Sequence, residues 1–225
     1  MKNKIFKNII FFVVILTVTL VASSCKNNLD LTVYVSEYRS YIYEGESDGY
    51  LVTVSVEERE DPFIIDGFVG SVKKILSVKL ETKNSLIDDA KIELGYDGIK
   101  ASGNFVYSPL NGKYVAEITV EKLPTSPTIS GVLISADNEC KLELKSKVLS
   151  GNLAYTEILE KIKEQDGKTV EKLFNNASVS TEIHIRLICD NNKNYYYVGF
   201  CSKEGKTYAY LVDAKTGEIV ATKQN

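Results

Sequence analysis

The chain has 225 residues, with 27 basic and 30 acidic side chains, one histidine and no tryptophan. Its net charge of −3 argues against nucleic-acid binding, which needs a basic surface, and against electrostatic docking on anionic lipids. Charged residues make up 25% of the chain and hydrophobic residues 44%, which is the balance of an ordered globular protein.

The first predicted element is an export signal. Lys2, Lys4 and Lys7 precede an apolar run over residues 9–21, and small residues then lead to Cys25. This order is typical of a secretory signal peptide, and the run is shorter than the ~20 apolar residues of a bilayer span. The segment Ala-Ser-Ser-Cys resembles the lipobox of bacterial lipoproteins, although Ala22 stands where that family usually has leucine.

The lipobox resemblance implies that residues 1–24 are removed and that Cys25 carries lipid, with a short tether over residues 25–28. An uncleaved anchor or cleavage at another position is the alternative. Without its three leader lysines the chain has 24 basic and 30 acidic residues, a net charge of −6. The acyl chains on Cys25 are therefore expected to hold the protein to the cell membrane, on its extracytoplasmic side.

Residues 29–148 are expected to form an all-β sandwich. Apolar and polar residues alternate with period two, and Gly, Asn, Asp and Pro turn signals separate the segments. Many short strands with scattered turns resemble an immunoglobulin-like module at the level of pattern, and the exact topology stays open. The clearest alternating segments are 31–35, 50–56, 75–80, 113–120 and 140–147.

Residues 150–225 are expected to form a small α+β domain, a helix packed on an antiparallel meander. Apolar residues over 152–165 recur at helical spacing, Asp166-Gly167 ends that helix, and Thr169 can cap a second short one. The links between the strands that follow are short, which favours antiparallel neighbours. The strand candidates are 181–189, 195–201, 206–212 and 218–222.

Hydrophobicity also suggests a register for this meander. Pairing Cys189 with Tyr196, and Lys203 with Lys206 around Glu204-Gly205, gives one continuous apolar face to receive the helix. The residues of that face are Ile183, Ile185, Leu187, Val198, Phe200, Ala209 and Leu211. The opposite face then carries His184, Arg186, Ile188, Tyr195, Tyr197, Cys201, Tyr208 and Tyr210.

The end of the chain resembles a PepSY domain. The segment Val212-Asp-Ala-Lys-Thr-Gly-Glu-Ile219 matches the last hairpin of that family, and the preceding helix fits in order. Asp-x-x-Thr-Gly is also a general hairpin sequence, in which Asp213 caps the turn and Gly217 takes a positive φ, so an unrelated helix-on-sheet domain is the alternative. The resemblance implies an extracytoplasmic, non-catalytic role such as peptidase inhibition, and it transfers no catalytic residue.

Few residues suggest catalysis or metal binding. His184 and Cys201 are expected to face each other across two strands, which allows a Cys–His dyad but provides no orienting group or oxyanion turn. The carboxylates over residues 57–61 are read as a solvated charge run, and no zinc or calcium spacing is present in the sequence. We therefore predict no enzyme activity, no metal and no cofactor.

The remaining constellation is a tyrosine patch, which we define as Arg186, Tyr195, Tyr197, Tyr208 and Tyr210. Tyrosine and arginine are favoured in interface cores, so this patch is the predicted recognition surface; packing on the preceding domain is the alternative. The sequence thus predicts a non-catalytic, membrane-anchored envelope lipoprotein that binds or regulates an extracytoplasmic protein, such as a peptidase. The alternative is a surface protein that binds or hydrolyses carbohydrate or peptidoglycan.

Overall fold

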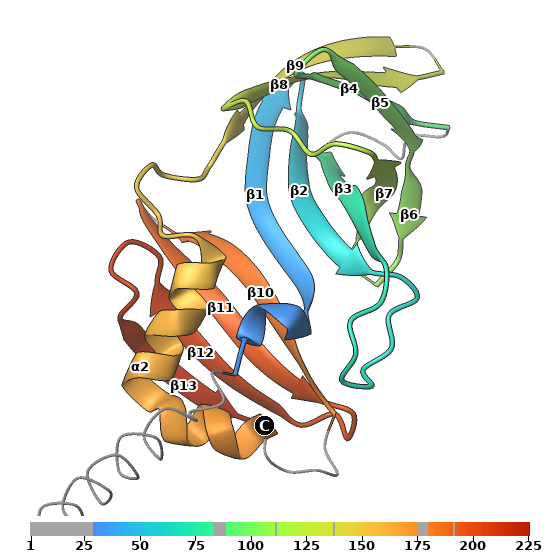
Figure 1. Ribbon diagram of the computed structural model, residues 1–225. Helices are drawn as coiled ribbons and strands as arrows, with labels where there is room; N and C mark the ends of the chain where they lie inside the picture. The colour runs from blue at the N-terminus through green and yellow to red at the C-terminus, as the bar shows by residue number, and fades with distance from the viewer. Residues whose placement is uncertain (1–28, 83–88, 111, 137, 175–179, 191) are drawn as a thin grey trace, which may run out of the picture. The chain divides into compact units, whose positions relative to one another are not determined.

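The computed structural model describes residues 29–82, 89–110, 112–136, 138–174, 180–190 and 192–225 (Figure 1). The predicted signal peptide, the tether and Cys25 lie outside the described residues, so their predictions are untested. Residues Leu31–Asn225 form one unit. Within the described part of the chain, no helix has both the length and the apolar character of a membrane span.

The first two thirds of this unit are strands, as the period-two pattern predicts. In chain order the elements are η1 (Leu31–Tyr34), β1 (Val35–Ser47), β2 (Tyr50–Glu60), β3 (Val72–Thr82), β4 (Lys91–Tyr96), β5 (Ile99–Asn104), β6 (Val106–Ser108), β7 (Lys113–Val120), β8 (Thr128–Ser135) and β9 (Asn138–Ser146).

One expected strand is wrong. Residues 31–34 form the 3-10 helix η1, and β1 begins only at Val35. Leu31 is fully buried, and the Tyr34 ring packs 4.7 Å from the Phe174 ring, so contacts with a distant helix decide the local conformation. A five-residue alternation is too short to exclude this outcome.

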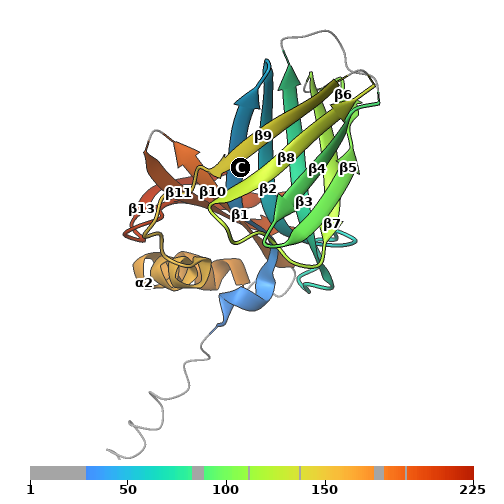
Figure 2. The same ribbon diagram turned by 90° about the horizontal axis from the view of Figure 1, so that it is seen from above.

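The strands form one continuous, mostly antiparallel sheet. On one side of β1 the strand order is β2, β3, β7, β6. On its other side, the second half of β1 pairs with β9, and the order continues β8, β4, β5. Figure 2 shows these two runs curving toward each other, so this part of the sheet is nearly barrel-shaped. The expected immunoglobulin-like sandwich of two separate sheets is not confirmed.

The interior of the curved sheet is a single apolar cluster. Alternate residues of β2 and β3 point into it, and Tyr43 is fully buried there, with its hydroxyl donating to the Ser126 carbonyl at 2.8 Å. Each fully buried aliphatic side chain contributes about 1.5–3 kcal/mol, so this cluster is the main source of stability for the strands. Its β2 and β3 members are Tyr50, Val52, Val54, Val56, Leu76, Val78 and Leu80.

The last third is a helix followed by an antiparallel meander, as predicted. It comprises α2 (Tyr155–Phe174), β10 (Thr181–Asp190), β11 (Lys193–Ser202), β12 (Thr207–Asp213) and β13 (Ile219–Gln224). Helix α2 has a kink at Asp166, where φ is −139° and ψ is 42°, so the predicted break is confirmed. Ile158, Leu159, Ile162 and Val170 are the buried residues of the helix.

The observed register differs from the predicted one at both hairpins. Cys189 faces Asn194 instead of Tyr196, a shift of two residues that leaves the same side chains on each face. Val198 faces Tyr210 instead of Leu211, a shift of one residue that reverses the two faces of β12. The cause is a three-residue loop, in which Ser202 N–H donates to the Lys206 carbonyl and Gly205 has φ +80°.

Strand β1 connects the two regions of the unit. The start of β1 pairs in parallel with β10, with Val35 opposite Ile183 and Tyr38 opposite Ile185, whereas Tyr43 and Glu44 pair with β9. Hydrogen bonding therefore continues across the domain boundary expected near residue 150. The division into domains at 29–148 and 150–225 stays a prediction.

Candidate functional site

Three residues of the predicted tyrosine patch lie together. Arg186 is on β10, and Tyr195 and Tyr197 are on β11, all on the sheet face that α2 does not cover, which we call the outer face. Tyr197 leans along its strand over Gly199, where an added Cβ would lie 2.9 Å from the Tyr197 hydroxyl. Burial raises the pKa of the Tyr197 hydroxyl, which is therefore neutral at physiological pH.

The other two tyrosines do not belong to this face, so the five-residue patch is wrong as a single surface. The reversed register of β12 turns Tyr208 and Tyr210 toward α2. Tyr210 is fully buried, its ring packs 5.7 Å from the Phe200 ring, and its hydroxyl donates to Asp166 Oδ2 at 3.0 Å. A recognition role for Arg186, Tyr195 and Tyr197 stays a prediction.

An ion-pair ladder borders the outer face where β1 meets β10. The guanidinium of Arg186 contacts both oxygens of buried Glu37, at 2.9 and 3.2 Å. Arg39 contacts Glu57, also buried, at 3.1 Å. Because buried carboxylates are costly unless paired, these ion pairs indicate a structural role: Arg186–Glu37 joins β10 to β1, and Arg39–Glu57 joins β1 to β2.

His184 and Cys201 are diagonal neighbours on the outer face, with Cys201 Sγ 3.5 Å from His184 Nδ1; the direct pairing that we expected is wrong, because Cys201 faces Glu182 and His184 faces Gly199. Burial lowers the pKa of the His184 imidazole and raises the pKa of the Cys201 thiol. These directions favour a neutral pair, whereas a nucleophilic dyad needs a thiolate beside an imidazolium. The Phe63 ring packs 5.3 Å from the imidazole on the same side.

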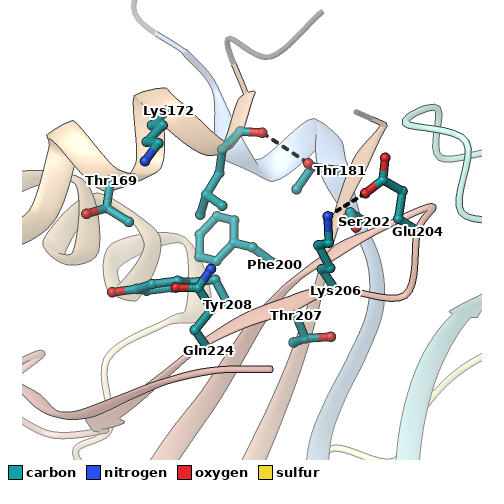
Figure 3. A pocket seen from close by; sticks show the side chains of 11 residues that line it. Thr169, Lys172, Thr181, Phe200, Ser202, Glu204, Lys206, Thr207, Tyr208 and Gln224 are labelled. Atoms are coloured by element: carbon teal, nitrogen blue, oxygen red, sulfur yellow. Dashed lines mark hydrogen bonds and ion pairs between the residues drawn. The ribbon is translucent and has the colours of Figure 1, made fainter. Parts of the chain in front are cut away.

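A cavity of about 360 Å³ lies between the second segment of α2 and the sheet (Figure 3). We call it the helix-end pocket. The rings of Phe200 and Tyr208 form its apolar part, Lys172 approaches from α2, and Lys206 approaches from the hairpin that leads to β12. The full lining is Thr169, Lys172, Leu173, Thr181, Phe200, Ser202, Glu204, Lys206, Thr207, Tyr208 and Gln224.

Some polar groups of this pocket have hydrogen-bond or ion-pair partners, and one buried hydroxyl has none among the described residues. Lys206 pairs with Glu204 at 2.8 Å, and the Thr181 hydroxyl donates to the Leu173 carbonyl at 3.1 Å. Ser202 Oγ is buried and has no hydrogen-bond partner among the described residues. A small, partly aromatic cavity with an unused hydroxyl is suited to holding a side chain or chain end of another molecule.

The sequence did not reveal this pocket, because it depends on the direction of α2 after the kink and on the register of β12. Only Tyr208 was among the predicted site residues, and it was expected on the opposite face. Among the described residues, no group of three or more His, Cys, Asp or Glu side chains is arranged to hold a metal ion.

The strand at the edge of the pocket has an unpaired side. Within the described residues β13 pairs only with β12, and Gln224, its last residue, also lines the helix-end pocket. The turn before β13 is built as predicted: Asp213 Oδ1 accepts the N–H groups of Lys215 and Thr216, both at 2.9 Å. Gly217 has φ +73°, so the turn sequence is explained by its geometry.

Comparison with known protein families gives a match over the C-terminal part of the chain. The domain described as "Peptidase propeptide and YPEB domain", PepSY, matches residues 153–223. The matched segment contains α2, β10–β12 and all of β13 except Gln224, which supports the predicted PepSY-like C-terminal region. No curated protein matches the chain.

Proposed function

We propose that this protein is a non-catalytic lipoprotein of the cell envelope that binds and regulates an extracytoplasmic protein, with a peptidase as the first candidate. The match to PepSY over residues 153–223 carries the proposal, because that family is a propeptide and inhibitory family. The matched segment supplies every lining residue of the helix-end pocket except Gln224.

The mode of binding follows from the pocket and its neighbouring strand. An extended segment of the partner adds along the unpaired side of β13, where main-chain hydrogen bonds provide affinity. One of its side chains enters the helix-end pocket, stacks on Phe200 and Tyr208, and accepts a hydrogen bond from Ser202 Oγ. The Lys172 ammonium favours a segment that carries a carboxylate at this point.

Membrane attachment is a separate part of the proposal. Cys25, which follows small residues after an apolar run, receives the acyl chains that keep the protein on the extracytoplasmic side of the membrane. Metabolic labelling with a palmitate analogue is expected to mark the wild-type chain and to leave the Cys25→Ala variant unmarked. An unmarked wild-type chain would refute the attachment.

Inhibition is tested by titrating the purified protein into envelope extract and measuring protein hydrolysis. Wild type is expected to lower the rate, and Lys172→Glu is expected to weaken this effect by about tenfold, because it reverses the charge at the pocket. Lys168→Glu is the matched control, since Lys168 is exposed on the same helix and does not line the pocket. Equal loss in both variants, or no inhibition by wild type, would contradict the proposed site.

A further inference from the structure

The loop between β2 and β3, residues 61–71, exposes large apolar side chains. Phe68 is 81% exposed and Ile64 is 54% exposed, and Phe63 is also exposed. The next strand begins with exposed Val72. Single exposed apolar residues need no explanation, but several on one short loop indicate a surface that meets an apolar partner.

This loop is held in place by hydrogen bonds from its backbone. The N–H groups of Asp66 and Gly67 donate to one oxygen of Glu182 on β10, at 2.9 and 3.2 Å. Gly70 N–H donates to Glu60 Oε1, and Asp61 N–H donates to the Ser71 carbonyl at 3.0 Å. The apolar side chains are therefore displayed from a fixed scaffold.

The charged side chains of the loop, Asp61 and Asp66, also have partners. Asp61 forms an ion pair with Lys73, and Asp66 Oδ1 accepts the Phe68 N–H at 2.9 Å. Entry of a polypeptide segment into an apolar medium is opposed mainly by unsatisfied backbone groups and unpaired charges. In this loop many of those groups already have partners, so Ile64 and Phe68 can leave water at low cost.

The loop lies at the end of β1 where the chain enters the unit. Val35, the first residue of β1, faces Ile183, and the adjacent residue Glu182 is the one that holds the loop. Val35 directly follows η1, which begins at Leu31 and has an exposed side chain at Val33. Leu31 follows Cys25 by six positions, and six residues of extended chain span at most about 20 Å.

We propose that the 61–71 loop inserts Ile64 and Phe68 into the surface of the bilayer that holds the acyl chains of Cys25. This inference rests on the proposed lipid attachment. The bilayer is favoured over a protein partner because the tether keeps Leu31 close to the membrane, and the loop shares that end of β1. Apolar insertion of the loop adds buried side-chain area to the attachment that the acyl chains provide.

The absence of tryptophan from the chain allows a direct test. Phe68→Trp places one fluorophore at the loop tip in the full-length protein, purified from membranes and reconstituted into vesicles of zwitterionic lipid. Leu110→Trp is the matched control: Leu110 is 97% exposed and follows β6, at the opposite end of β3, about 30 Å away. Flotation measures attachment, and brominated acyl chains quench only a fluorophore that contacts them.

The Phe68→Trp protein is expected to lose most of its fluorescence in brominated vesicles, whereas the Leu110→Trp protein keeps its fluorescence. If both proteins float with the vesicles and neither is quenched, the loop proposal is refuted and lipid attachment stands. If neither protein floats, lipid attachment fails and the loop proposal fails with it. Equal quenching of both would show non-specific adsorption and would also refute the proposal.

Discussion

The hydroxyl of Tyr210 donates a 3.0 Å hydrogen bond to Oδ2 of Asp166, the residue at which α2 kinks. The other oxygen of the same carboxylate accepts the Thr169 hydroxyl at 2.7 Å. The Asp166 side chain thus links the end of the first segment of α2 to the start of the second, and it connects the helix to β12. The second segment carries Lys172 over the helix-end pocket, so this contact positions the proposed binding site.

Tyr210→Phe is expected to lower the free energy of unfolding by about 1.5–3 kcal/mol, because it leaves a carboxylate oxygen without its buried partner. Urea denaturation measures the difference. Tyr195→Phe, on the outer face, is the control and is expected to change stability by less than about 0.5 kcal/mol. An equally small effect of Tyr210→Phe would show that the contact does not hold the kink.

Acid sensitivity of the last hairpin is expected from Asp213. The backbone N–H groups of Thr216 and Lys215 lower the pKa of its carboxyl in the folded state. A lowered pKa means that the contribution to stability is present above the unfolded-state value of about 3.9 and is lost as the pH falls through the folded-state value. Asp213→Asn should therefore be less stable than wild type at pH 7, by under about 1 kcal/mol because solvent screens the group.

Thermal melts of wild type and Asp213→Asn between neutral and strongly acid pH provide the measurement. The difference in melting temperature should shrink as the Asp213 carboxyl becomes protonated. A difference that stays constant over this range would mean that the charge of Asp213 does not stabilise the turn.

The thiol of Cys201 is expected to react slowly. Burial raises its pKa, and the neighbouring His184 is neutral because burial lowers the pKa of its imidazole. Alkylation of Cys201 by iodoacetamide, followed by peptide mass spectrometry, should rise only at pH values above about 8.5, the ordinary thiol pKa. The urea-unfolded chain serves as the control, and fast reaction of the folded protein at pH 6 would reveal the thiolate–imidazolium pair that this geometry disfavours.

Glu182→Ala should release the 61–71 loop, since the N–H groups of Asp66 and Gly67 lose their shared acceptor. These hydrogen bonds are only partly buried, so the loss of each costs about 0.5–1.5 kcal/mol. Limited chymotrypsin digestion is expected to cleave after Phe63 or Phe68 faster than in wild type. Glu139→Ala is the control, because Glu139 is an exposed residue of β9. Unchanged cleavage in Glu182→Ala would show that other contacts hold the loop.

Local sequence signals predicted much of the C-terminal region. The 3.6-residue spacing before Asp166 and the period-two strands from residue 181 reflect which side chains each element can bury, and these patterns need no knowledge of distant residues. The Asp213–Gly217 turn is also local, since the aspartate bonds N–H groups two and three residues ahead. For this reason the helix, its break, the meander and the resemblance to PepSY could all be predicted.

The position of each element relative to its neighbours was less predictable. Both faces of β12 carry residues that can be buried, Ala209 and Leu211 on one and Tyr210 and Val212 on the other, so hydrophobicity did not separate two registers one residue apart. The two-residue loop that we assumed at Glu204-Gly205 is a three-residue loop. That single difference moved Tyr208 and Tyr210 from the predicted surface to the helix side.

By itself, the sequence determined the order and type of the C-terminal elements, the helix break and the last turn, because each depends on residues a few positions apart. The tertiary structure alone decided the register of β12, the pairing of β1 with β10, the nearly closed sheet and the helix-end pocket. Those features depend on contacts between residues as far apart as Glu37 and Arg186, whose energies no local pattern contains.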